Sequence, residues 1–333
     1  MSTGAAVTHQ HKLSPDDIEQ VFDAHRRELT GYCYRMLGSG FEADDAVQEV
    51  MVRAWRAAAQ FEGRSSVRSW LYRIATNVCL DMLRGRQRRA RPVEMGGASP
   101  PEERYLGAPL PESTWVSPVP DRAVLGDGLD PAEETALRES VRLAFVTALQ
   151  HLPPRQRAAV LLCDVLRWQA SETAELLDTS VAAVNSALQR ARVTLGKLDT
   201  EERPAAVEPS QAKLLAAYVD AFERYDIPAL VNLLQSDAIQ SMPPYALWLQ
   251  GAEDISRWLL GPGIGCKGSR LLAAPSANGC PAFGQYRIDP EGGHKPFGLH
   301  VLEISGPTIT QDTVFLDSGP LFAAFGLPTH LPD

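Results

Sequence analysis

A proline-rich, acidic stretch divides the chain into parts that cannot share one continuous helical core. Between residues 92 and 134, prolines stand at positions 92, 100, 101, 109, 111, 118, 120 and 131. Proline lacks a backbone donor and interrupts helices and strands, and a stretch with little apolar surface cannot offset the entropy cost of ordering itself. We therefore interpret 92–134 as a semi-extended linker, in which Trp115 is suited to docking on a folded part.

Helical patterns lie on both sides of this linker. Residues 15–91 carry apolar side chains at helical spacing, which predicts an all-α bundle. The same spacing returns over 135–198, where Pro153 stops one helix and Pro154 fits the first turn of the next. The sequence thus predicts a helical bundle and a second, smaller all-α domain.

Residues 208–328 follow a different pattern. Two helices, expected at about 211–225 and 227–235, precede runs of strand-like alternation. A hairpin-type Asn278-Gly279 step and a Gly306-Pro307 turn separate these runs. The last third is therefore predicted to be α+β, and the whole chain to be multidomain.

The composition, 44% hydrophobic and 22% charged, is ordinary for a soluble protein. No apolar run is long enough for a secretory signal or a membrane span, so we expect a cytoplasmic protein that does not contact membranes. The five cysteines include no C-x-x-C pair, which argues against a disulfide framework and a zinc site. We expect no metal and no cofactor.

The net charge of −9 hides a strongly basic segment. Residues 64–91 contain eight arginines against a single acidic residue, Asp81. Such density attracts polyphosphates because each neutralised phosphate releases counterions, whereas the charge of a whole chain says little about one face. The alternative is an ordinary solvated surface.

The stretch ASETAELLDTSVAAVNSALQRAR, residues 170–192, has the spacing of a helix-turn-helix, with Ser180 placed to cap the second helix. One face of that helix is apolar: Val181, Val184, Leu188, Ala191 and Leu195. Its other faces offer side chains that can bond base edges or phosphates: Asn185, Ser186, Gln189, Arg190 and Arg192. Many helical hairpins share this spacing, so the surrounding sequence must decide.

That surrounding sequence resembles a known family. LPPRQRAAVLLCDVLRWQASETAELLDTSVAAVNSALQRARVTL resembles the fourth region of extracytoplasmic-function sigma factors, which binds the minus-thirty-five promoter element. HRRELTGYCYRMLGSGFEADDAVQEVMVRAWRAAAQFEG, followed by SSVRSWLYRIATNVCLDMLRGRQRR, is similar to their second region. The resemblance covers roughly 15–91 and 135–198. It implies a non-enzymatic factor that directs core RNA polymerase to specific promoters and promotes initiation.

For the polymerase, the resemblance implies that the helix of DDAVQEV docks on the clamp helices of the β′ subunit, with further contacts to the β subunit. The implied contact residues are Asp44, Asp45, Gln48 and Glu49. The neighbouring Val47, Val50 and Trp55 suit a mixed protein interface, in which charges set orientation and aromatics supply affinity. A solvated acidic helix face is the alternative.

For promoter DNA, the resemblance implies that the arginine-rich segment holds the opened non-template strand of the minus-ten element, using cations and aromatic surfaces. The implied residues are Arg64, Arg68, Trp70, Arg73, Asn77, Arg84 and Arg88. Trp70 is equally suited to the core, and Arg86, Arg89 and Arg91 would join Arg88 on upstream phosphates.

Many family members carry lysine where Asn185 stands, so the preference for the sequence of the minus-thirty-five element should differ. The linker would thread the polymerase RNA exit and active-site region.

Residues 208–328 resemble a SnoaL-like domain of the nuclear transport factor 2-like superfamily, a cone-shaped barrel around a pocket. Sigma factors resembling the sigma G group carry this extension. The candidate pocket residues are Tyr245, Trp248, Phe297, His300 and Asp317. Two functions fit this domain: an acid/base enzyme and a regulatory module, either of which could bind a small-molecule ligand. The fusion of the domain to two DNA- and polymerase-binding domains favours regulation.

For the whole chain, the alternative is a stand-alone helix-turn-helix regulator with a ligand-sensing or vestigial enzymatic domain at its C-terminal end. The acidic DDAVQEV helix tells against this alternative, because a repressor needs no contact with the polymerase clamp.

Overall fold

The computed structural model describes residues 15–61, 63, 65–126, 131–196, 209–316 and 318–332. The chain forms two compact units: Met1–Arg86 with Leu152–Thr194, and Gln87–His151 with Leu195–Asp333. These units cross the domain boundaries predicted from the sequence. The linker and the first helices of the predicted second domain belong to the unit that contains the C-terminal third.

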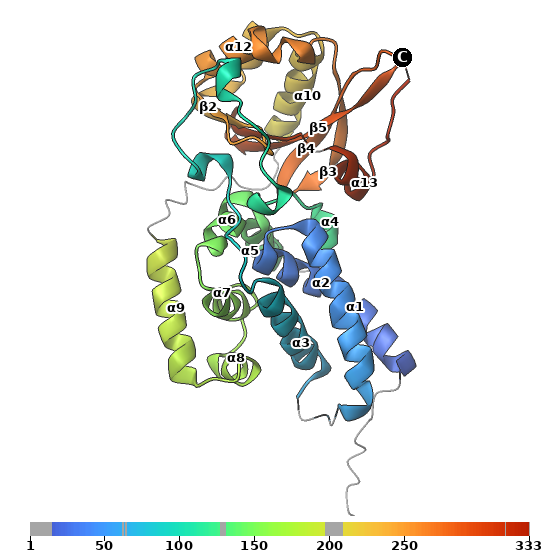
Figure 1. Ribbon diagram of the computed structural model, residues 1–333, viewed down its shortest axis with the longest axis vertical. Coiled ribbons are helices and arrows are strands. Elements are labelled where there is room, and N and C mark those ends of the chain that lie inside the picture. Colours follow the sequence, from blue (N-terminus) through green and yellow to red (C-terminus); the bar gives the residue numbers. More distant parts are fainter. Residues whose placement is uncertain are drawn as a thin grey trace, which may run out of the picture. The chain divides into compact units, whose positions relative to one another are not determined.

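The first unit is helical (Figure 1). Its helices are α1 (Pro15–Leu37), α2 (Gly40–Ala57), α3 (Val67–Met82), α7 (Pro154–Val160), α8 (Ala170–Leu176) and α9 (Val181–Leu195). A 3-10 turn, Ala58–Gln60, extends α2, and a π-helical turn, Leu161–Val165, extends α7. The predicted all-α character of both sigma-like segments is confirmed over these residues.

The turn between α1 and α2 follows from its two residues. Gly38 has φ +74°, a left-handed conformation that glycine adopts without steric cost, and its amide donates to the carbonyl of Tyr34 at 2.7 Å. Ser39 then caps α2, because its hydroxyl accepts from the amide of Glu42 at 3.4 Å. The turn lets the two helices pack on each other through Leu29, Tyr32, Met36, Leu37, Ala46, Val50 and Ala54, all of which are buried.

The second unit begins with the linker. It contains the short helix α4 (Asp121–Val124) and three 3-10 turns: Pro92–Glu94, Glu103–Tyr105 and Glu112–Thr114. Helices α5 (Pro131–Val141) and α6 (Leu143–Gln150) follow. Trp115 is buried, as its apolar ring suggested, and the linker is held by hydrogen bonds that its own composition does not reveal.

The C-terminal third is α+β, as predicted. Its helices are α10 (Pro209–Glu223), α11 (Ile227–Val231), α12 (Ala252–Leu260) and α13 (Ser318–Phe325), with a 3-10 turn at Pro262–Cys266. Its strands are β1 (Leu234–Ser241), β2 (Trp248–Gln250), β3 (Arg270–Ala277), β4 (Cys280–Ile288), β5 (His294–Ser305) and β6 (Thr308–Phe315). The second predicted helix ends four residues early, because the chain enters β1 at Leu234.

These strands form one mixed sheet in the order β2-β1-β6-β5-β4-β3. The β1–β6 pair is parallel and the other pairs are antiparallel. Helices α10 and α12 lie beside the sheet (Figure 1). They contribute Tyr218, Phe222, Ile255 and Trp258 to an apolar cluster that also includes strand residues. The α+β fold is confirmed, but the sheet ends at β2 and β3 rather than closing as the predicted barrel.

The two predicted turns of the sheet are present. Asn278 and Gly279 both have positive φ, +54° and +72°, and join β3 to β4 with Ala277 opposite Cys280. Gly306, at φ +54°, lies in the turn that pairs Ser305 with Thr308 between β5 and β6. Both positions demand a residue that tolerates the left-handed region, which explains why these hairpins could be located from the sequence.

Candidate nucleic-acid interface

Helix α2 divides its residues between a core face and a polar face. Ala43, Ala46, Val47, Val50 and Ala54 are buried. The four predicted polymerase contacts are all exposed: Asp44, Asp45, Gln48 and Glu49. The helical spacing therefore gathers these side chains on the side of α2 that faces away from the core.

Two apolar side chains extend this polar face. Val52 is 40% exposed and Trp55 is 57% exposed, whereas Val47 and Val50, also predicted to join the interface, lie in the core. Glu49 forms an ion pair with Arg53 in the same helix at 2.7 Å, so its negative charge is partly neutralised there. Tryptophan is enriched at protein interfaces, so a mostly exposed Trp55 sets this face apart from an ordinary solvated helix surface.

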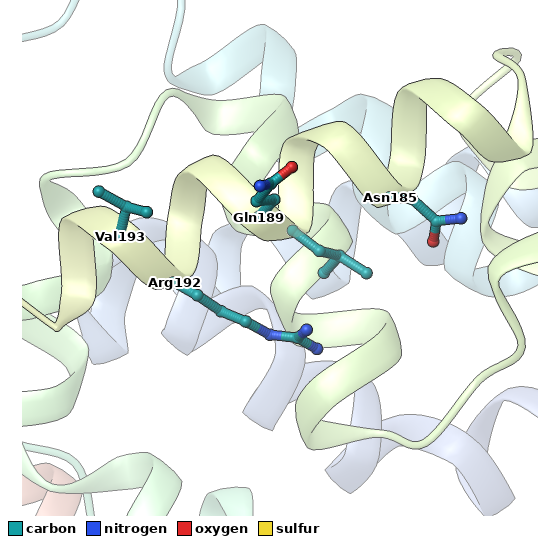
Figure 2. Close-up of a pocket in the computed structure, with 5 residues that line it drawn as sticks. Asn185, Gln189, Arg192 and Val193 are labelled. Carbon is teal, nitrogen blue, oxygen red and sulfur yellow. The ribbon is translucent and has the colours of Figure 1, made fainter.

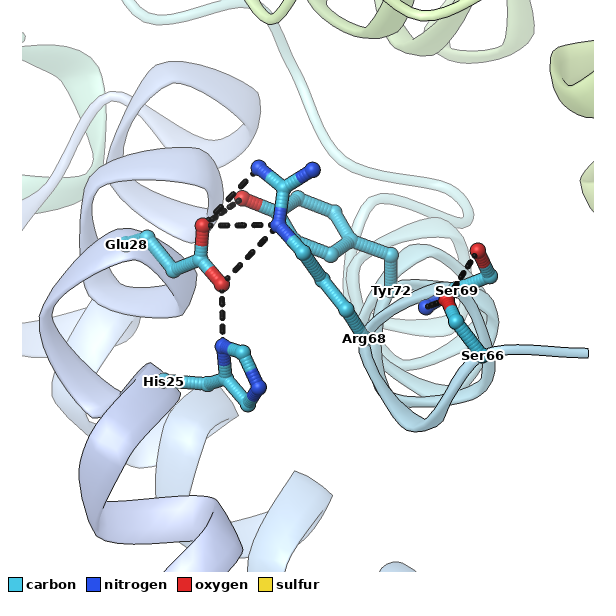
Figure 3. Close-up of polar contacts among 6 residues, drawn as sticks. All are labelled: His25, Glu28, Ser66, Arg68, Ser69 and Tyr72. Carbon is cyan, nitrogen blue, oxygen red and sulfur yellow. Dashed lines mark hydrogen bonds and ion pairs between the residues drawn. The ribbon is translucent and has the colours of Figure 1, made fainter.

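Helix α3 carries the predicted minus-ten residues and begins at a serine cap. The hydroxyl of Ser66 accepts from the amide of Ser69 at 3.0 Å. At the second residue of the helix, Arg68 donates from Nε and Nη2 to Oε2 of Glu28 in α1, at 3.0 and 2.9 Å (Figure 3). The same carboxylate contacts His25 Nδ1 at 2.5 Å and the Tyr72 hydroxyl at 3.4 Å. Glu28 thus fixes the guanidinium of Arg68 by one edge.

Residues that precede and form α8 touch the same part of α3. The ring of Trp168 lies 5.1 Å from the ring of Tyr72, and the guanidinium of Arg68 lies 5.4 Å from the Trp168 ring. Arg73 donates from Nη2 to the carbonyl and to Oε1 of Glu175, at 3.2 and 3.4 Å. These interactions place two of the predicted minus-ten arginines against the helix-turn-helix.

The other predicted minus-ten residues are dispersed. Trp70 is half-buried with its ring 5.2 Å from Phe61, Asn77 is exposed, and Arg84 is exposed with Asp81 at 2.9 Å. Arg88 belongs to the second unit, where Nη1 contacts His151 Nδ1 at 2.9 Å. Arg64 lies outside the described residues.

Two of the additional upstream arginines have partners within the chain. Arg86 forms an ion pair with Glu42. Arg89 is buried and donates to the carbonyls of Glu112 and Trp115, at 2.9 and 2.6 Å. The expectation that Arg89 holds duplex phosphate is therefore wrong for this structure, because its guanidinium satisfies linker carbonyls instead.

Helix α9 presents the predicted minus-thirty-five residues. Ser180 caps it as expected, since its hydroxyl accepts from the amide of Ala183 at 3.1 Å. The remaining candidates are all exposed: Asn185, Ser186, Gln189, Arg190 and Arg192. Val184, Leu188 and Ala191 form the buried face, but Val181 is 43% exposed, so its assignment to the core was wrong. It lies in the first turn, before the helix reaches its packing partners.

A hollow of about 580 Å³ lies along this helix, lined by Asn185, Leu188, Gln189, Arg192 and Val193 (Figure 2). Arg192 donates from Nη2 and Nε to Asp164 in the π-helical turn, at 2.7 and 3.3 Å. The amide, guanidinium and apolar groups of the hollow are of the kinds that read base edges and thymine methyl groups.

The predicted pocket residues of the C-terminal domain make separate contacts. Trp248 is buried, and its Nε1 donates to the carbonyl of Gly96 in the linker at 3.0 Å. Tyr245 and Phe297 are half-buried, and Arg287 stacks over the Phe297 ring at 3.5 Å. Asp317 lies outside the described residues.

His300 belongs to a buried polar cluster that the sequence did not predict. Its Nδ1 lies 3.1 Å from both carboxylate oxygens of Asp312 and 3.2 Å from the Tyr218 hydroxyl, and its Nε2 lies 3.0 Å from Gln285 Oε1. Tyr218 also donates to Asp312 at 3.1 Å. Burial, reinforced by the Asp312 carboxylate, raises the pKa of Tyr218 well above its usual range, which keeps the phenol protonated.

The linker and α5 are joined to the C-terminal domain by a group of hydrogen bonds, here called the linker clamp. From the linker, they join Gly96 and Ser99 with Trp248, Leu110 with Pro244, Val119 with Asn278, and Asp121 with Gly279; from α5, they join Val141 with Asn278. Asn278 is central to it. Its Oδ1 accepts from the amide of Val119 at 3.0 Å and its Nδ2 donates to the carbonyl of Val141 at 2.6 Å. The Asn-Gly turn signal located this residue, but no local pattern reveals its long-range partners.

Within the described ranges, no group of three or more histidine, cysteine, aspartate or glutamate side chains is arranged to hold a metal ion. No described helix is long and apolar enough to cross a membrane.

Comparison with known proteins identifies both helical segments. Residues 21–89 match the family model for sigma-70 region 2, and residues 142–195 match the model for sigma-70 region 4. The helix-turn-helix and the acidic α2 face are therefore parts of a sigma-70-type transcription factor.

Comparison over most of the chain identifies the family within this class. It is 46% identical over 329 residues to the ECF RNA polymerase sigma factor SigG of Mycobacterium tuberculosis (strain ATCC 25618 / H37Rv), covering 95% of this chain and 86% of that one. It is also 26% identical over 186 residues to the ECF RNA polymerase sigma factor SigW of Bacillus subtilis (strain 168), covering 56% of this chain and 90% of that one. The chain belongs to the extracytoplasmic-function RNA polymerase sigma factors.

A solved structure shares the fold. The crystal structure of the Mycobacterium tuberculosis extracytoplasmic function sigma factor SigJ matches with a TM-score of 0.60 at 22% identity, covering 93% of this chain and all of that one. The match includes the C-terminal third, so this α+β domain is part of the shared architecture. As a sigma factor, a class of proteins that are not enzymes, the chain binds core RNA polymerase and promoter DNA.

Proposed function

We propose that the exposed face of α2 is the surface that docks on the clamp helices of the polymerase β′ subunit, in the cytoplasm. The supporting observation is that Asp44, Asp45, Gln48 and Glu49 are exposed together beside Trp55, while the opposite face of α2 is fully used by the core. Acidic groups orient the encounter, and an exposed tryptophan supplies affinity when it becomes buried.

A positive charge added to this face tests the proposal. Gln48→Arg places a cation among the acids and should weaken association of the full chain with core polymerase at least tenfold. Gln20→Arg, at an exposed position of α1, makes the same change off this face and should leave the affinity unchanged. Equal affinities of the two variants would contradict the assignment of α2.

For promoter recognition, we propose that α9 reads the minus-thirty-five element and α3 the minus-ten element. Asn185 and Gln189 face the hollow of α9, where amides can bond adenine edges. Gln189→Ala should change base preference, whereas Arg190→Ala should weaken binding evenly across sequences and lower the salt dependence by about one phosphate contact. Binding of the polymerase holoenzyme to a promoter library separates these outcomes.

We propose that the C-terminal domain regulates initiation by holding the linker through the linker clamp. If the linker has to enter the polymerase RNA exit and active-site region, its bonds to the domain must first break, so binding of the linker by the domain competes with initiation. The observation that carries the proposal is that the side chains of Asn278 and Trp248, both buried, form hydrogen bonds with backbone groups of the linker and of α5.

Transcription rates test this competition. Trp248→Phe keeps the ring but removes the hydrogen bond to Gly96, and should raise the rate of initiation by core polymerase with the full chain. Trp258→Phe is the matched control, because Trp258 is a buried tryptophan in the apolar cluster of the same domain. A rate unchanged or lowered by Trp248→Phe relative to this control would contradict regulation through the linker.

An acid/base enzyme or a ligand receptor in the C-terminal domain is less well supported. His300, Asp312, Tyr218 and Gln285 are buried and bond to one another. A cluster whose polar groups satisfy each other supports a structural role. A small-molecule ligand of this domain would have to reach other groups or displace these bonds.

A further inference from the structure

The helices α5 and α6 are separated at a place where the sequence gives no reason to end a helix. Residues 132–152 contain neither proline nor glycine. Apolar side chains continue at helical spacing across the junction: Leu137, Val141, Phe145, Ala148 and Leu152. Yet Arg142 has a ψ of 141°, outside the helical region, so α5 ends at Val141 and α6 begins at Leu143.

The residues around this break do not account for it. Arg142 is not one of the residue types that favour a helix start, and its side chain forms no capping hydrogen bond to α6. The hydroxyl of Ser140 donates to the carbonyl of Leu137 at 2.6 Å. Such a bond bends a helix slightly, but it does not involve the carbonyl of Val141, where the helix ends. The cause of the break therefore lies outside the two helices.

The β3–β4 hairpin supplies that cause. The side chain of Asn278 is fully buried, and its Nδ2 donates to the carbonyl of Val141 at 2.6 Å. In a continuous helix, this carbonyl would accept from the amide of Phe145, four residues further along the chain. A side chain that enters the ladder of helical hydrogen bonds is a known cause of sharp kinks. Asn278 thus takes the place of the Phe145 amide.

The neighbours of Asn278 hold the hairpin against the same turn of α5. A Cβ at Gly279 would lie 2.9 Å from Cγ and 3.2 Å from the carbonyl oxygen of Arg138, so glycine is needed for this close approach. Arg142 Nη1 lies 3.8 Å from the sulfur of Cys280, the first residue of β4. The hairpin therefore contacts both the last turn of α5 and the residue at which the helix breaks.

We propose that Asn278 is a positioning residue for region 4: it keeps residues 131–150 as two helices, and withdrawal of the hairpin lets them join as one. The sigma-70 region 4 match begins at residue 142, so α6 is the first helix of that region. Extending an existing helix requires no new nucleus, so the joined helix forms readily once the Val141 carbonyl is released.

Joining the helices changes the direction of α6 relative to α5, and with it the direction of the start of region 4. The C-terminal domain then has two positions to offer region 4, and any contact that moves the hairpin shifts the balance between them. This inference goes beyond the proposed competition for the linker, because it concerns α5 and α6 whether or not the linker is bound.

Amide hydrogen exchange in the full chain tests the role of Asn278. The Phe145 amide is among the first of α6, which lack a carbonyl partner within that helix. Asn278→Gly keeps the φ of +54° in the turn and removes the donor to Val141, so the Phe145 amide should exchange about tenfold more slowly than in the wild type. The Cα chemical shift of Arg142 should move to its helical value.

The direction of this effect makes it specific. A general loss of stability only speeds exchange, whereas a new bond between the Phe145 amide and the Val141 carbonyl slows it. The new bond also gives Val141 a partner, which places the stability loss of Asn278→Gly near the lower end of what two lost hydrogen bonds imply. Unchanged or faster Phe145 exchange in folded Asn278→Gly would overturn the proposal.

A second variant decides the matter if Asn278→Gly does not fold. Gly279→Ala retains the side chain of Asn278 but places a methyl group against Arg138, which pushes the hairpin away from α5. It should slow exchange of the Phe145 amide in the same way, and unchanged exchange would count equally against the proposal.

Two control variants separate this inference from its alternatives. Ser140→Ala removes the bond to Leu137 and should leave Phe145 exchange unchanged; slower exchange would assign the break to the local sequence instead. Trp248→Phe weakens the hold on the linker without touching the hairpin and should also leave Phe145 exchange unchanged. If Trp248→Phe fails to raise initiation while Asn278→Gly slows Phe145 exchange, regulation through the linker fails and the role of Asn278 stands.

Discussion

Replacing Asn278 by glycine should detach part of the linker from the C-terminal domain without disturbing the hairpin turn. Glycine accepts the φ of +54° at this position, so the turn itself is retained. Both side-chain bonds are lost, leaving the amide of Val119 and the carbonyl of Val141 without these partners. A buried group left unpaired costs about 1–3 kcal/mol, so the two together predict a loss of about 2–6 kcal/mol. Asn278→Ala adds about 1–2 kcal/mol of left-handed strain.

Urea unfolding gives the total loss of stability, and amide hydrogen exchange at Val119 gives its location. We expect the Val119 amide to exchange at least tenfold faster in Asn278→Gly, because local opening no longer breaks the bond to Oδ1. Asn232→Gly, at an exposed position of the same domain, controls for the change of residue type. Unaltered Val119 exchange with a stability loss below about 0.5 kcal/mol would refute the role given to Asn278.

Three further predictions concern the helical domains. Trp55→Ala should change stability by less than about 0.5 kcal/mol, because the ring is 57% exposed, yet lower polymerase affinity at least tenfold in surface plasmon resonance. Ser180→Ala should cost about 1 kcal/mol by removing the cap on the Ala183 amide and should weaken binding to minus-thirty-five duplex in fluorescence anisotropy. Although Asp44 is exposed on the α2 face, partial desolvation of its carboxyl, and secondarily the charge of Asp45, raise its pKa, so its ionised form is disfavoured in the folded state. Asp44→Asn should therefore raise the unfolding temperature at pH 7, and this gain should vanish as the pH falls through the raised pKa, where the wild-type carboxyl is protonated.

The exposed faces of α2 and α9 could be predicted because both depend on local periodicity. Once Val50 and Ala54 are assigned to the core, helix geometry requires Asp45 and Glu49 to face outward. The Asn278-Gly279 hairpin was predictable for a similar reason, since few residues accept two successive left-handed conformations.

The linker clamp and the contacts between α3 and α8 could not be predicted, because they join residues far apart in the sequence. Asn278 bonds to Val119, 159 positions away, and Arg73 bonds to Glu175, 102 positions away. Arg89 is a further example of a long-range contact that the sequence does not reveal. Nothing in its arginine-rich surroundings distinguishes it from its neighbours, yet it is buried and donates to a carbonyl of the linker. Proline content marked the linker as unable to order itself, but the surface that orders it lies in another domain.

The central claim is that this chain directs RNA polymerase to promoters, and transcription tests it most directly. Core polymerase with the full chain should initiate at a limited set of sites in a genomic promoter library, and those sites should share two elements spaced as in sigma-dependent promoters. The absence of both specific initiation and polymerase binding would contradict the account and leave a stand-alone DNA-binding regulator as the better description.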